Sequence, residues 1–432
     1  PRAALERGRA QTSEKMSRWS HVTEAPPDPI LGVSVAFKAD PSDKKVNLGI
    51  GAYRDEHGKP WVLDCVKEAE KKICADLNSG AIDEEYLPVQ GLQAFIDNTS
   101  RVILGDESPA LKEKRVAVVQ SLSGTGALRI AAEFLSIYNP GTTVYVSDPT
   151  WSNHITIFNK AGLTVKMYRY LTKKMTLDID GMLEDLKAAD DNCTFVLHTV
   201  AHNPSGVDPT QEQWKKIGEV VLAKKAVPIF DTAYQGYASG DLNKDAWSVR
   251  YFADTLGVEL MVTQSYSKNF GLYGERIGGL NVVCKDSETA GKVRSQLNGI
   301  IRPMISNPPL HGARLVSTVL ADKALTAKWE AELKIMSDRI IAMRTALKNA
   351  LDEIKCSPPS DVFPDWSHVV DQIGMFAYTG LEAKHVDILT AKHHIYCTKN
   401  GRFSMAGINP DNVKYIAEAI KDALATAGPS AS

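Results

Sequence analysis

At 432 residues, the chain is longer than one simple core requires, and we expect two domains or more. Its 50 basic side chains oppose 52 acidic ones, so the formal net charge of -2 gives no general attraction to nucleic acid or to an anionic membrane. No apolar run approaches the roughly 18 residues of a membrane helix, so we predict no membrane association.

The first 18 residues are polar and Arg-rich, without the long apolar centre of a secretory signal. They are interpreted either as a trimmed mitochondrial transit segment, which Glu6 and Glu14 count against, or as extra residues ahead of an initiator Met16. We therefore expect residues 1–18 to form a leader without regular structure. The string APPDPILG from Ala25 predicts an extended arm stiffened by proline.

From Val116 onward, short apolar runs alternate with helical patterns. The predicted strands are VAVV from Val116, VYV from Val144, FVL from Phe195, VPIF from Val227, LMV from Leu260 and LNVV from Leu280. Between the first two, Gly126 to Tyr138 has one apolar face at helical spacing. This alternation predicts an α/β domain with a mostly parallel sheet.

After the SNPP turn at Ser306, the pattern changes to one long amphipathic helix from about Leu320 to Ile354. The string IGMFAYTGL that follows predicts a strand and a turn. A composition shift near the middle of the helix predicts a second, smaller α/β domain. We assign 19–60 to an N-terminal arm and part of the small domain, 61–337 to the large domain, and 338–432 to the small domain.

Polar side chains collect just past the C-terminal ends of four predicted strands, the edge where open α/β sheets bind ligands. VAVV runs into SLSGTGALR, FVL leads to HTVAHNPSG, VPIF ends in DTAY, and LMV ends in QSYSKNFGLYGER. Four such strand ends point to one binding site more strongly than any single motif does. The six scattered cysteines lack CxxC pairs and metal-ligand spacing, so we predict free thiols and no metal site.

The string SGTG from Ser123 begins a helix after a strand, and the free N–H groups at such a start can bind phosphate. A glycine turn that only joins strand to helix is the commoner interpretation of this string by itself. The chain has no GxGxxG and no Walker A spacing, which disfavours a dinucleotide or ATP site.

Lys268 and Asp231 follow two other strands. A single lysine is usually a surface residue, and Asp231 could be a helix cap. A buried carboxylate at a strand end needs a cationic partner, however, and a pyridinium nitrogen is one. A lysine, an acid and a phosphate site are what pyridoxal phosphate requires. Arg276 could reach the same phosphate, or could form only a surface ion pair.

At these residues the sequence resembles the aspartate aminotransferases, in the fold-type I class of pyridoxal-phosphate enzymes. The match covers about Ser17 to Ala425. It rests on PPDPILG, VNLGIGAYRDEHGKPWVL, EYLPVQG, QSLSGTGALR, DPTWSNH, AHNPSGVDP, DTAYQGYASGD, QSYSKNFGLYGERIGG, SNPPLHGAR and DQIGMFAYTGL. It implies a seven-stranded, mostly parallel sheet flanked by helices, and reversible amino transfer between L-aspartate and 2-oxoglutarate, giving oxaloacetate and L-glutamate, with pyridoxal 5'-phosphate as cofactor.

The resemblance also implies the catalytic roles. Lys268 matches the lysine that carries the cofactor as a Schiff base and moves the substrate's α-proton. Asp231 matches the partner of the pyridine nitrogen, and His154 matches a group behind that carboxylate. Asn203 and Tyr234 match the hydrogen-bond donors to the ring's phenolic oxygen.

Further residues match the family's cofactor contacts. Trp151 matches the aromatic side chain stacked on the ring. The phosphate ligands match Ser123, Gly124, Thr125, Ser265 and Arg276. Tyr86 matches a phosphate ligand donated by a neighbouring subunit, which implies a homodimer whose active sites are shared across the interface.

The substrate contacts follow the same pattern. Arg402 matches the residue that binds the α-carboxylate. Gly51 and Asn203 match positions where the family also contacts this carboxylate, and Trp151 is a further substrate contact. Arg302 matches the residue of the other subunit that pairs with the distal carboxylate of a dicarboxylic substrate. These matches imply small dicarboxylates as substrates.

The departures from the family are few. Ser205 stands where threonine is usual, and FSMAG follows Arg402 where a shorter aliphatic-polar pattern is more common. An aromatic amino-acid aminotransferase, a fold-type I lyase or decarboxylase, and a non-catalytic binding protein remain as alternatives. The motifs fit the mitochondrial matrix or the cytoplasm: PPDPILG and the Arg-rich start favour the first, SKNFGLY and DTAYQG fit both, and secretion is not expected.

Overall fold

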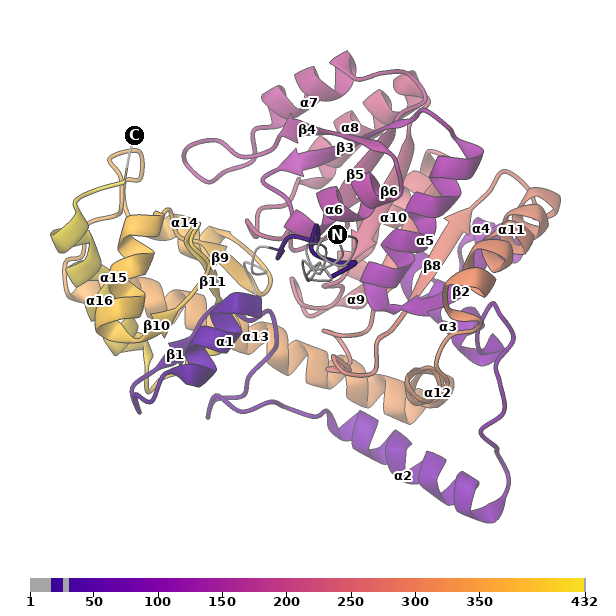
Figure 1. Cartoon of the computed structure of the whole chain (residues 1–432), viewed down its shortest axis with the longest axis horizontal. Coiled ribbons are helices and arrows are strands. Elements are labelled where there is room, and N and C mark those ends of the chain that lie inside the picture. The colour runs from indigo at the N-terminus through magenta and orange to yellow at the C-terminus, as the bar shows by residue number, and fades with distance from the viewer. Residues whose placement is uncertain (1–16, 26–30, 431–432) are drawn as a thin grey trace, which may run out of the picture.

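The computed structural model describes residues 17–25 and 31–430 (Figure 1). Most of the predicted leader and most of the proline-stiffened arm lie outside the described residues. In the described ranges, no helix is long and apolar enough to cross a membrane.

A seven-stranded sheet forms the centre of the larger part of the molecule, in the order β2-β8-β7-β6-β5-β3-β4. Its strands are β2 (Val116–Leu122), β3 (Thr143–Asp148), β4 (Thr164–Arg169), β5 (Thr194–His198), β6 (Val227–Thr232), β7 (Leu260–Ser265) and β8 (Ile277–Val283). Strand β8 is antiparallel to both of its neighbours, and the other neighbouring pairs are parallel. The predicted mostly parallel sheet is therefore confirmed.

Six of these strands coincide with the predicted apolar runs, and β4 does not. Strand β4 has the sequence TVKMYR and lies at the edge of the sheet, where most of its side chains are exposed. An edge strand that buries little has no continuous apolar run, so the periodicity of the sequence did not reveal it.

Alternate residues of the central strands face opposite layers of helices, because successive side chains of a strand point to opposite faces. In β5, Val196 belongs to one apolar cluster, while Phe195 and Leu197 belong to the other. The first cluster includes residues of α5 (Ser123–Tyr138), α6 (Ser152–Lys160) and α11 (Ser287–Ile305). The second includes residues of α7 (Ile179–Ala188), α8 (Gln211–Lys224), α4 (Pro109–Lys112), α10 (Trp247–Arg250) and the π-helical turn η1 (Tyr251–Thr255).

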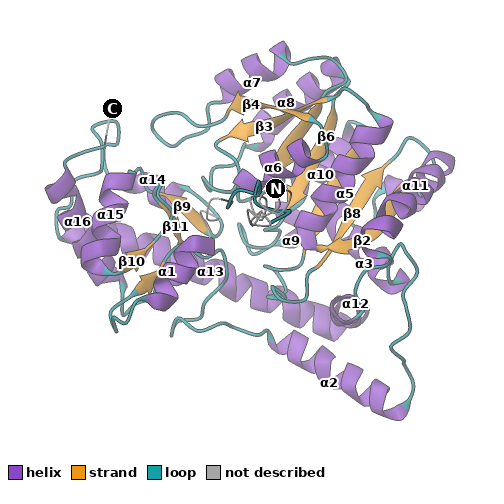
Figure 2. Ribbon diagram, in the orientation of Figure 1, coloured by secondary structure: helices purple, strands orange, loops and turns teal. Residues whose placement is uncertain are grey.

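A second group of elements lies beside the large sheet (Figures 1 and 2). It contains the parallel pair β1 (Val46–Asn47) and β10 (Ile395–Tyr396), and the antiparallel pair β9 (Phe376–Tyr378) and β11 (Arg402–Ser404). Its helices are α1 (Leu31–Ala39), α14 (Ser367–Asp371), α15 (Ala383–His393), the 3-10 turn η2 (Met405–Gly407) and α16 (Val413–Ala427). The strand predicted from IGMFAYTGL is β9.

The long helix predicted from about Leu320 to Ile354 is α13 (Lys323–Glu353), and a separate helix, α12 (His311–Ala321), precedes it. Asp322 separates them because its carboxylate accepts hydrogen bonds from the N–H groups of Ala324 and Leu325, at 2.9 and 3.2 Å. An aspartate in this position is a favourable N-cap, so it begins a new helix. Figure 1 shows α13 running between the two groups of elements, and we propose the domain boundary within it, at residues 337–338.

The remaining helices lie around this frame: α2 (Asp64–Ser79), α3 (Gln93–Leu104) and α9 (Leu242–Asp245). Helix α2 packs against α12 and α13. Its N-terminus is bound by Glu332 of α13, whose two carboxylate oxygens accept from the N–H groups of Asp64 and Cys65, at 2.6 and 3.1 Å. A side chain distant in sequence thus replaces the local cap that α2 lacks.

Candidate active site

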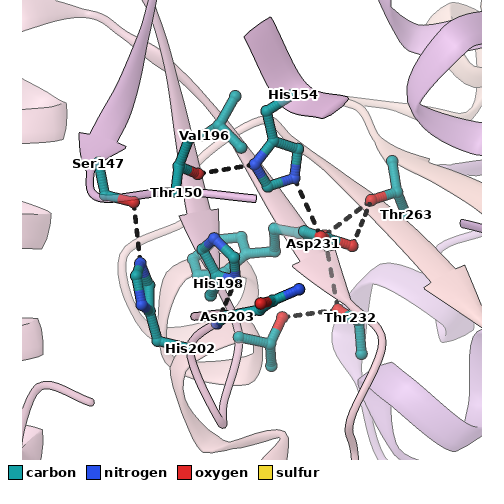
Figure 3. Close-up of polar contacts among 12 residues, drawn as sticks. Ser147, Thr150, His154, Val196, His198, His202, Asn203, Asp231, Thr232 and Thr263 are labelled. Atoms are coloured by element: carbon teal, nitrogen blue, oxygen red, sulfur yellow. Dashed lines mark hydrogen bonds and ion pairs between the residues drawn. The ribbon is translucent and has the colours of Figure 1, made fainter. Parts of the chain in front are cut away.

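The C-terminal ends of the parallel strands β5, β6 and β7 bring together most of the predicted site residues, as expected for an open α/β sheet. Asp231 lies near the end of β6 and is 8% exposed. His154 lies 3.1 Å from it, between Nε2 and Oδ2, and the hydroxyl of Thr150 lies 2.8 Å from Nδ1 of His154 (Figure 3). With Nδ1 accepting from Thr150, Nε2 carries the proton and donates to Asp231.

Asp231 stays ionised although it is buried. Burial favours its neutral form, but the hydrogen bond from His154, the electrostatic interaction with the imidazoles of His154 and His198, and the hydrogen bond from Thr263 outweigh that effect and hold the pKa of Asp231 below its usual value. In the described part of the chain, no lysine or arginine lies within ion-pair distance of this carboxylate. The site therefore offers a buried negative charge to a cationic group of a ligand, such as a protonated ring nitrogen.

Lys268 follows β7 in the turn after Ser265. Its Nζ donates to the carbonyl oxygen of Gly51 at 2.6 Å and lies 5.1 Å from the centre of the Tyr273 ring. Burial, together with the positive charges of Arg276 and Arg402, lowers the pKa of Lys268 from 10.5 to about 8. A lysine of this kind is partly neutral near physiological pH and can act as a nucleophile or a base.

Three serine hydroxyls meet at the start of α5. The Oγ of Ser123 lies 2.8 Å from that of Ser265 and 2.9 Å from that of Ser267, and Nη1 of Arg276 donates to Ser267 at 3.2 Å. A Cβ on Gly124 would lie 3.3 Å from the Cβ of Ser265, so glycine keeps this turn open. Hydroxyls, helix N–H groups and a guanidinium at one point fit a phosphate group.

Thr125 belongs to the first turn of the same helix and is partly buried. Ser267 was not among the predicted site residues. Its spacing of two from Ser265 past a strand end was an available signal, because alternate residues of an extended segment share a side.

Arg402 lies on β11, buried to 4% exposure. Its Nη1 donates to Oδ1 of Asn203 at 3.2 Å and its Nη2 to the carbonyl of Gly49 at 2.9 Å, while its Nε has no partner among the described residues. Its guanidinium carbon lies 4.1 Å from the centre of the Phe376 ring. A buried cation with a free donor fits a carboxylate of a ligand.

Arg402, Asn203 and Trp151 all line a cavity of about 640 Å³ between the two groups of elements. The ring of Trp151 meets that of His154 edge to face, at 5.3 Å between centroids. The ring of Tyr234 packs edge to face on Phe376 at 5.9 Å, and burial raises the pKa of its phenol, so its hydroxyl remains a proton donor.

Two predicted residues lie away from this site. Tyr86 is 87% exposed, and it lines with Arg302 a surface pocket of about 860 Å³ that contains none of the other predicted residues. Arg302 is exposed near the end of α11 and donates to the hydroxyl of Ser306 at 2.8 Å. The single chain does not bring these two residues to Lys268.

A row of buried histidines extends the polar network behind Asp231 (Figure 3). His198 and His202 lie 4.2 Å apart between ring centroids, and His198 lies 5.2 Å from His154. The hydroxyl of Ser205 lies 2.7 Å from Nδ1 of His202. Ser205 thus fulfils a hydrogen-bonding role with the hydroxyl that serine and threonine share.

A reactive lysine, a buried carboxylate and a phosphate-binding turn at one sheet edge fit pyridoxal phosphate, and the fold and site define a fold-type I enzyme that uses this cofactor. Among the described residues, no group of His, Cys, Asp or Glu side chains is placed to hold a metal ion.

Comparison with known proteins agrees with this class. The model of the family described as "Aminotransferase class I and II" matches residues 43–420 of this chain. A mitochondrial aspartate aminotransferase of Arabidopsis thaliana is 50% identical over 94% of this chain and 92% of its own.

Two solved structures are also similar. A cytoplasmic aspartate aminotransferase of Giardia lamblia has a TM-score of 0.92 and 42% identity, covering 96% of this chain and all of its own. An aromatic-amino-acid aminotransferase of Burkholderia pseudomallei, covalently bound to pyridoxal phosphate, has a TM-score of 0.89 and 41% identity, covering 95% of this chain and all of its own. This chain belongs to the class I and II aminotransferases and is a pyridoxal-phosphate-dependent transaminase.

Proposed function

We propose that this enzyme transfers an amino group reversibly between L-aspartate and 2-oxoglutarate, giving oxaloacetate and L-glutamate. The observation that carries the proposal is a pair of buried groups close enough to interact: the guanidinium of Arg402, which lines the cavity and has a free Nε among the described residues, and the amine of Lys268, whose pKa is lowered partly by that guanidinium. The names of the Arabidopsis and Giardia relatives support aspartate as one of the substrates.

Each residue has a distinct task in this reaction. When bound, pyridoxal phosphate supplies an electron sink for the charge left on the substrate's α-carbon after proton removal. Lys268 takes the α-proton and returns it, which its pKa of about 8 permits near neutral pH. Asp231, held ionised by His154, keeps a proton on the ring nitrogen. Asn203 and Tyr234 would donate hydrogen bonds to the ring's phenolic oxygen.

The cofactor's phosphate would be held at the start of α5. The ligands proposed within the chain are Ser123, Gly124, Thr125, Ser265 and Arg276, and Ser267 joins them through its bonds to Ser123 and Arg276. The indole of Trp151 would stack on the ring. These contacts orient the reacting bond and leave the amine of Lys268 free to move a proton.

The substrate would be selected by two arginines. Arg402, beside Asn203 and Gly51, would bind the α-carboxylate through the planar guanidinium, which matches a carboxylate with two parallel hydrogen bonds. Arg302 of the partner subunit would bind the distal carboxylate. We propose a homodimer for this reason, with Tyr86 of the partner subunit reaching the phosphate. The exposure of Tyr86 and Arg302 within one surface pocket supports this role.

The compartment is proposed as the mitochondrial matrix or the cytoplasm. The relatives of this chain include proteins named for each of these compartments. The start of the sequence, which favours the first, lies mostly outside the described residues.

The aromatic-amino-acid aminotransferase among the similar structures makes specificity the property to test. We expect wild-type enzyme to turn over aspartate with 2-oxoglutarate faster than it turns over tyrosine. Arg302→Asp should lower kcat/KM for aspartate by orders of magnitude, because a carboxylate left unpaired in a closed site costs several kcal/mol. Activity on tyrosine should fall much less. The measurement is steady-state kinetics on both substrates.

Arg294→Asp is the matched control, because Arg294 is exposed on the same helix and lines a different pocket. It should leave both substrates nearly unchanged. Equal losses on aspartate and tyrosine in Arg302→Asp would mean that Arg302 is structural and that the enzyme is not selective for dicarboxylates.

A further inference from the structure

Arg344 of α13 is buried, and it has no carboxylate partner in the part of the chain that the structure describes. Its side chain is 1% exposed, and it donates only to backbone carbonyls: Nη1 to Val369 at 2.8 Å, and Nη2 to Gly374 at 2.8 Å and to Phe376. Its Nε has no partner among the described residues. Burial alone lowers the pKa of Arg344 to about 9. Burying a cation in this way is unfavourable unless its hydrogen bonds compensate for the water contacts that it loses.

The three carbonyls belong to one segment, residues 369–376, which also contacts the turn that carries Asn203. The N–H of Ile373 donates to the carbonyl of Gly206 at 2.7 Å. Gly206 has a φ of +68°, and a Cβ there would lie 2.8 Å from the carbonyl oxygens of both Ile373 and Phe376. The segment is therefore held between Arg344 on one side and the turn of the large sheet on the other.

The end of this segment contacts Arg402, which lines the cavity, through the ring of Phe376. Strand β9 pairs with β11 so that Phe376 lies opposite Ser404 and Tyr378 opposite Arg402. Residues diagonal on neighbouring strands are within reach of an aromatic side chain. The Phe376 ring accordingly lies 4.1 Å from the guanidinium carbon of Arg402, and a Cβ on Gly51 would lie 2.8 Å from the same ring.

We propose that Arg344 is a positioning residue for substrate binding: its hydrogen bonds to residues 369–376 fix the Phe376 ring against Arg402 and thereby set the affinity for the substrate's α-carboxylate. The bond to the carbonyl of Phe376 fixes that peptide plane, and with it the direction of the Cα–Cβ bond that aims the ring. The ring then holds the face of the Arg402 guanidinium by a cation–π contact, so that the N–H groups at the edge of the guanidinium point to the ligand. This proposal rests on the proposed role of Arg402.

The test is equilibrium binding of succinate to the pyridoxal-phosphate-loaded enzyme by calorimetry. Succinate has two carboxylates but neither an amino nor an oxo group, so it binds without reacting. Arg344→Lys keeps the charge but cannot reach three carbonyls, and Phe376→Leu removes the ring. Each should raise the Kd about tenfold. The double variant should bind no more weakly than the weaker single variant, because both act through one contact.

A second readout separates positioning from folding. The KM for aspartate should rise in both single variants, while kcat should change much less. Arg344→Met, of similar length but without hydrogen-bond donors, should weaken the binding of succinate at least as much as Arg344→Lys does. Replacing a buried charge by an apolar side chain of similar size commonly preserves folding.

Arg339→Lys is the matched control. Arg339 lies on the same helix and donates to the carbonyls of Asp55 and Ile408, at 3.0 and 2.9 Å, away from residues 369–376. It should lower the Tm without changing the Kd for succinate. The proposal is overturned if the Arg344 variants lower the Tm but bind succinate as wild type does.

The role of Arg402 is tested separately. If Arg402→Lys itself leaves the Kd unchanged, the proposed carboxylate site is wrong. If Arg402→Lys raises the Kd but the Arg344 and Phe376 variants do not, only the positioning role of Arg344 is wrong.

Discussion

The surroundings of Lys268 differ strongly from those of a lysine side chain in water. Burial and the charges of Arg276 and Arg402 lower its pKa to about 8, whereas the ordinary value is 10.5. Between these two pH values the unfolded chain binds more protons than the folded one. The contribution of Lys268 to the stability of the cofactor-free protein therefore increases as the pH rises through this window.

The first prediction concerns the reactivity of Lys268 in cofactor-free protein. Acetylation of its amine should rise with pH and reach half its maximum rate near pH 8. The check is peptide mapping by mass spectrometry after short pulses of reagent. In Arg276→Gln the midpoint should move to higher pH, because one of the two cations that oppose protonation is gone. A midpoint that stays above pH 10 in the folded protein would contradict the environment described for Lys268.

The second prediction concerns Asp231. Asp231→Ala removes the negative charge that would keep the ring nitrogen protonated. The transition state should therefore lose about 3 kcal/mol of stabilisation, which lowers the rate roughly a hundredfold. Single-turnover kinetics with aspartate measure this step. Thr263→Val is the control: its hydroxyl is 3.5 Å from Oδ1 of Asp231, so its loss should change the rate by about threefold or less. Near-normal turnover of Asp231→Ala would refute the role.

At the scale of elements, α2 depends on a residue that is 268 positions away in sequence. Glu332 is 6% exposed, and its carboxylate binds the first two N–H groups of α2. This contact fixes α2 against α13 and sets the direction in which the chain leaves the N-terminal segment.

The third prediction follows from this contact. Glu332→Ala leaves the N–H groups of Asp64 and Cys65 without their acceptor, the second of them buried, and should destabilise the protein by about 1–3 kcal/mol. Urea unfolding of the cofactor-loaded enzyme measures the loss. Glu330→Ala changes an exposed residue of the same helix and should alter the midpoint little. If both variants unfold at the same urea concentration, Glu332 is not the cap that α2 needs.

At the scale of the whole molecule, two proposed site residues lie on the surface of the chain. Tyr86 and Arg302 share a pocket away from Lys268, and large exposed side chains grouped in this way fit an interface with a second copy. The proposed shared active sites make a prediction about mixed dimers.

Lys268→Ala and Arg302→Asp should each be inactive toward aspartate. When the two are unfolded together and refolded as a mixture, one site of each mixed dimer combines an intact Lys268 with an intact Arg302. Random pairing should then restore about a quarter of wild-type activity. Refolding each variant by itself is the control. A mixture that stays as inactive as its components would contradict sites shared between subunits.

Much of this architecture was predictable because it follows from local patterns of apolar and polar residues in the sequence. Apolar runs predicted β5, β6 and β7, since buried parallel strands are almost continuously apolar. The lysine, the aspartate and the SGTG turn follow such strands directly, so the carboxyl edge of the sheet had to bring them together. By contrast, the edge strand β4 buries few of its side chains and has no continuous apolar run, so periodicity by itself does not register it.

The sequence by itself determined the fold class, the cofactor chemistry and the family, because each depends on residue types at fixed spacing. Only the tertiary structure decided the contacts between distant segments. It placed the Phe376 ring beneath Arg402, Arg344 against the carbonyls of that segment, and Glu332 at the start of α2. These contacts use backbone carbonyls, N–H groups and ring faces, which every sequence contains. Their function arises only from the position that folding gives them.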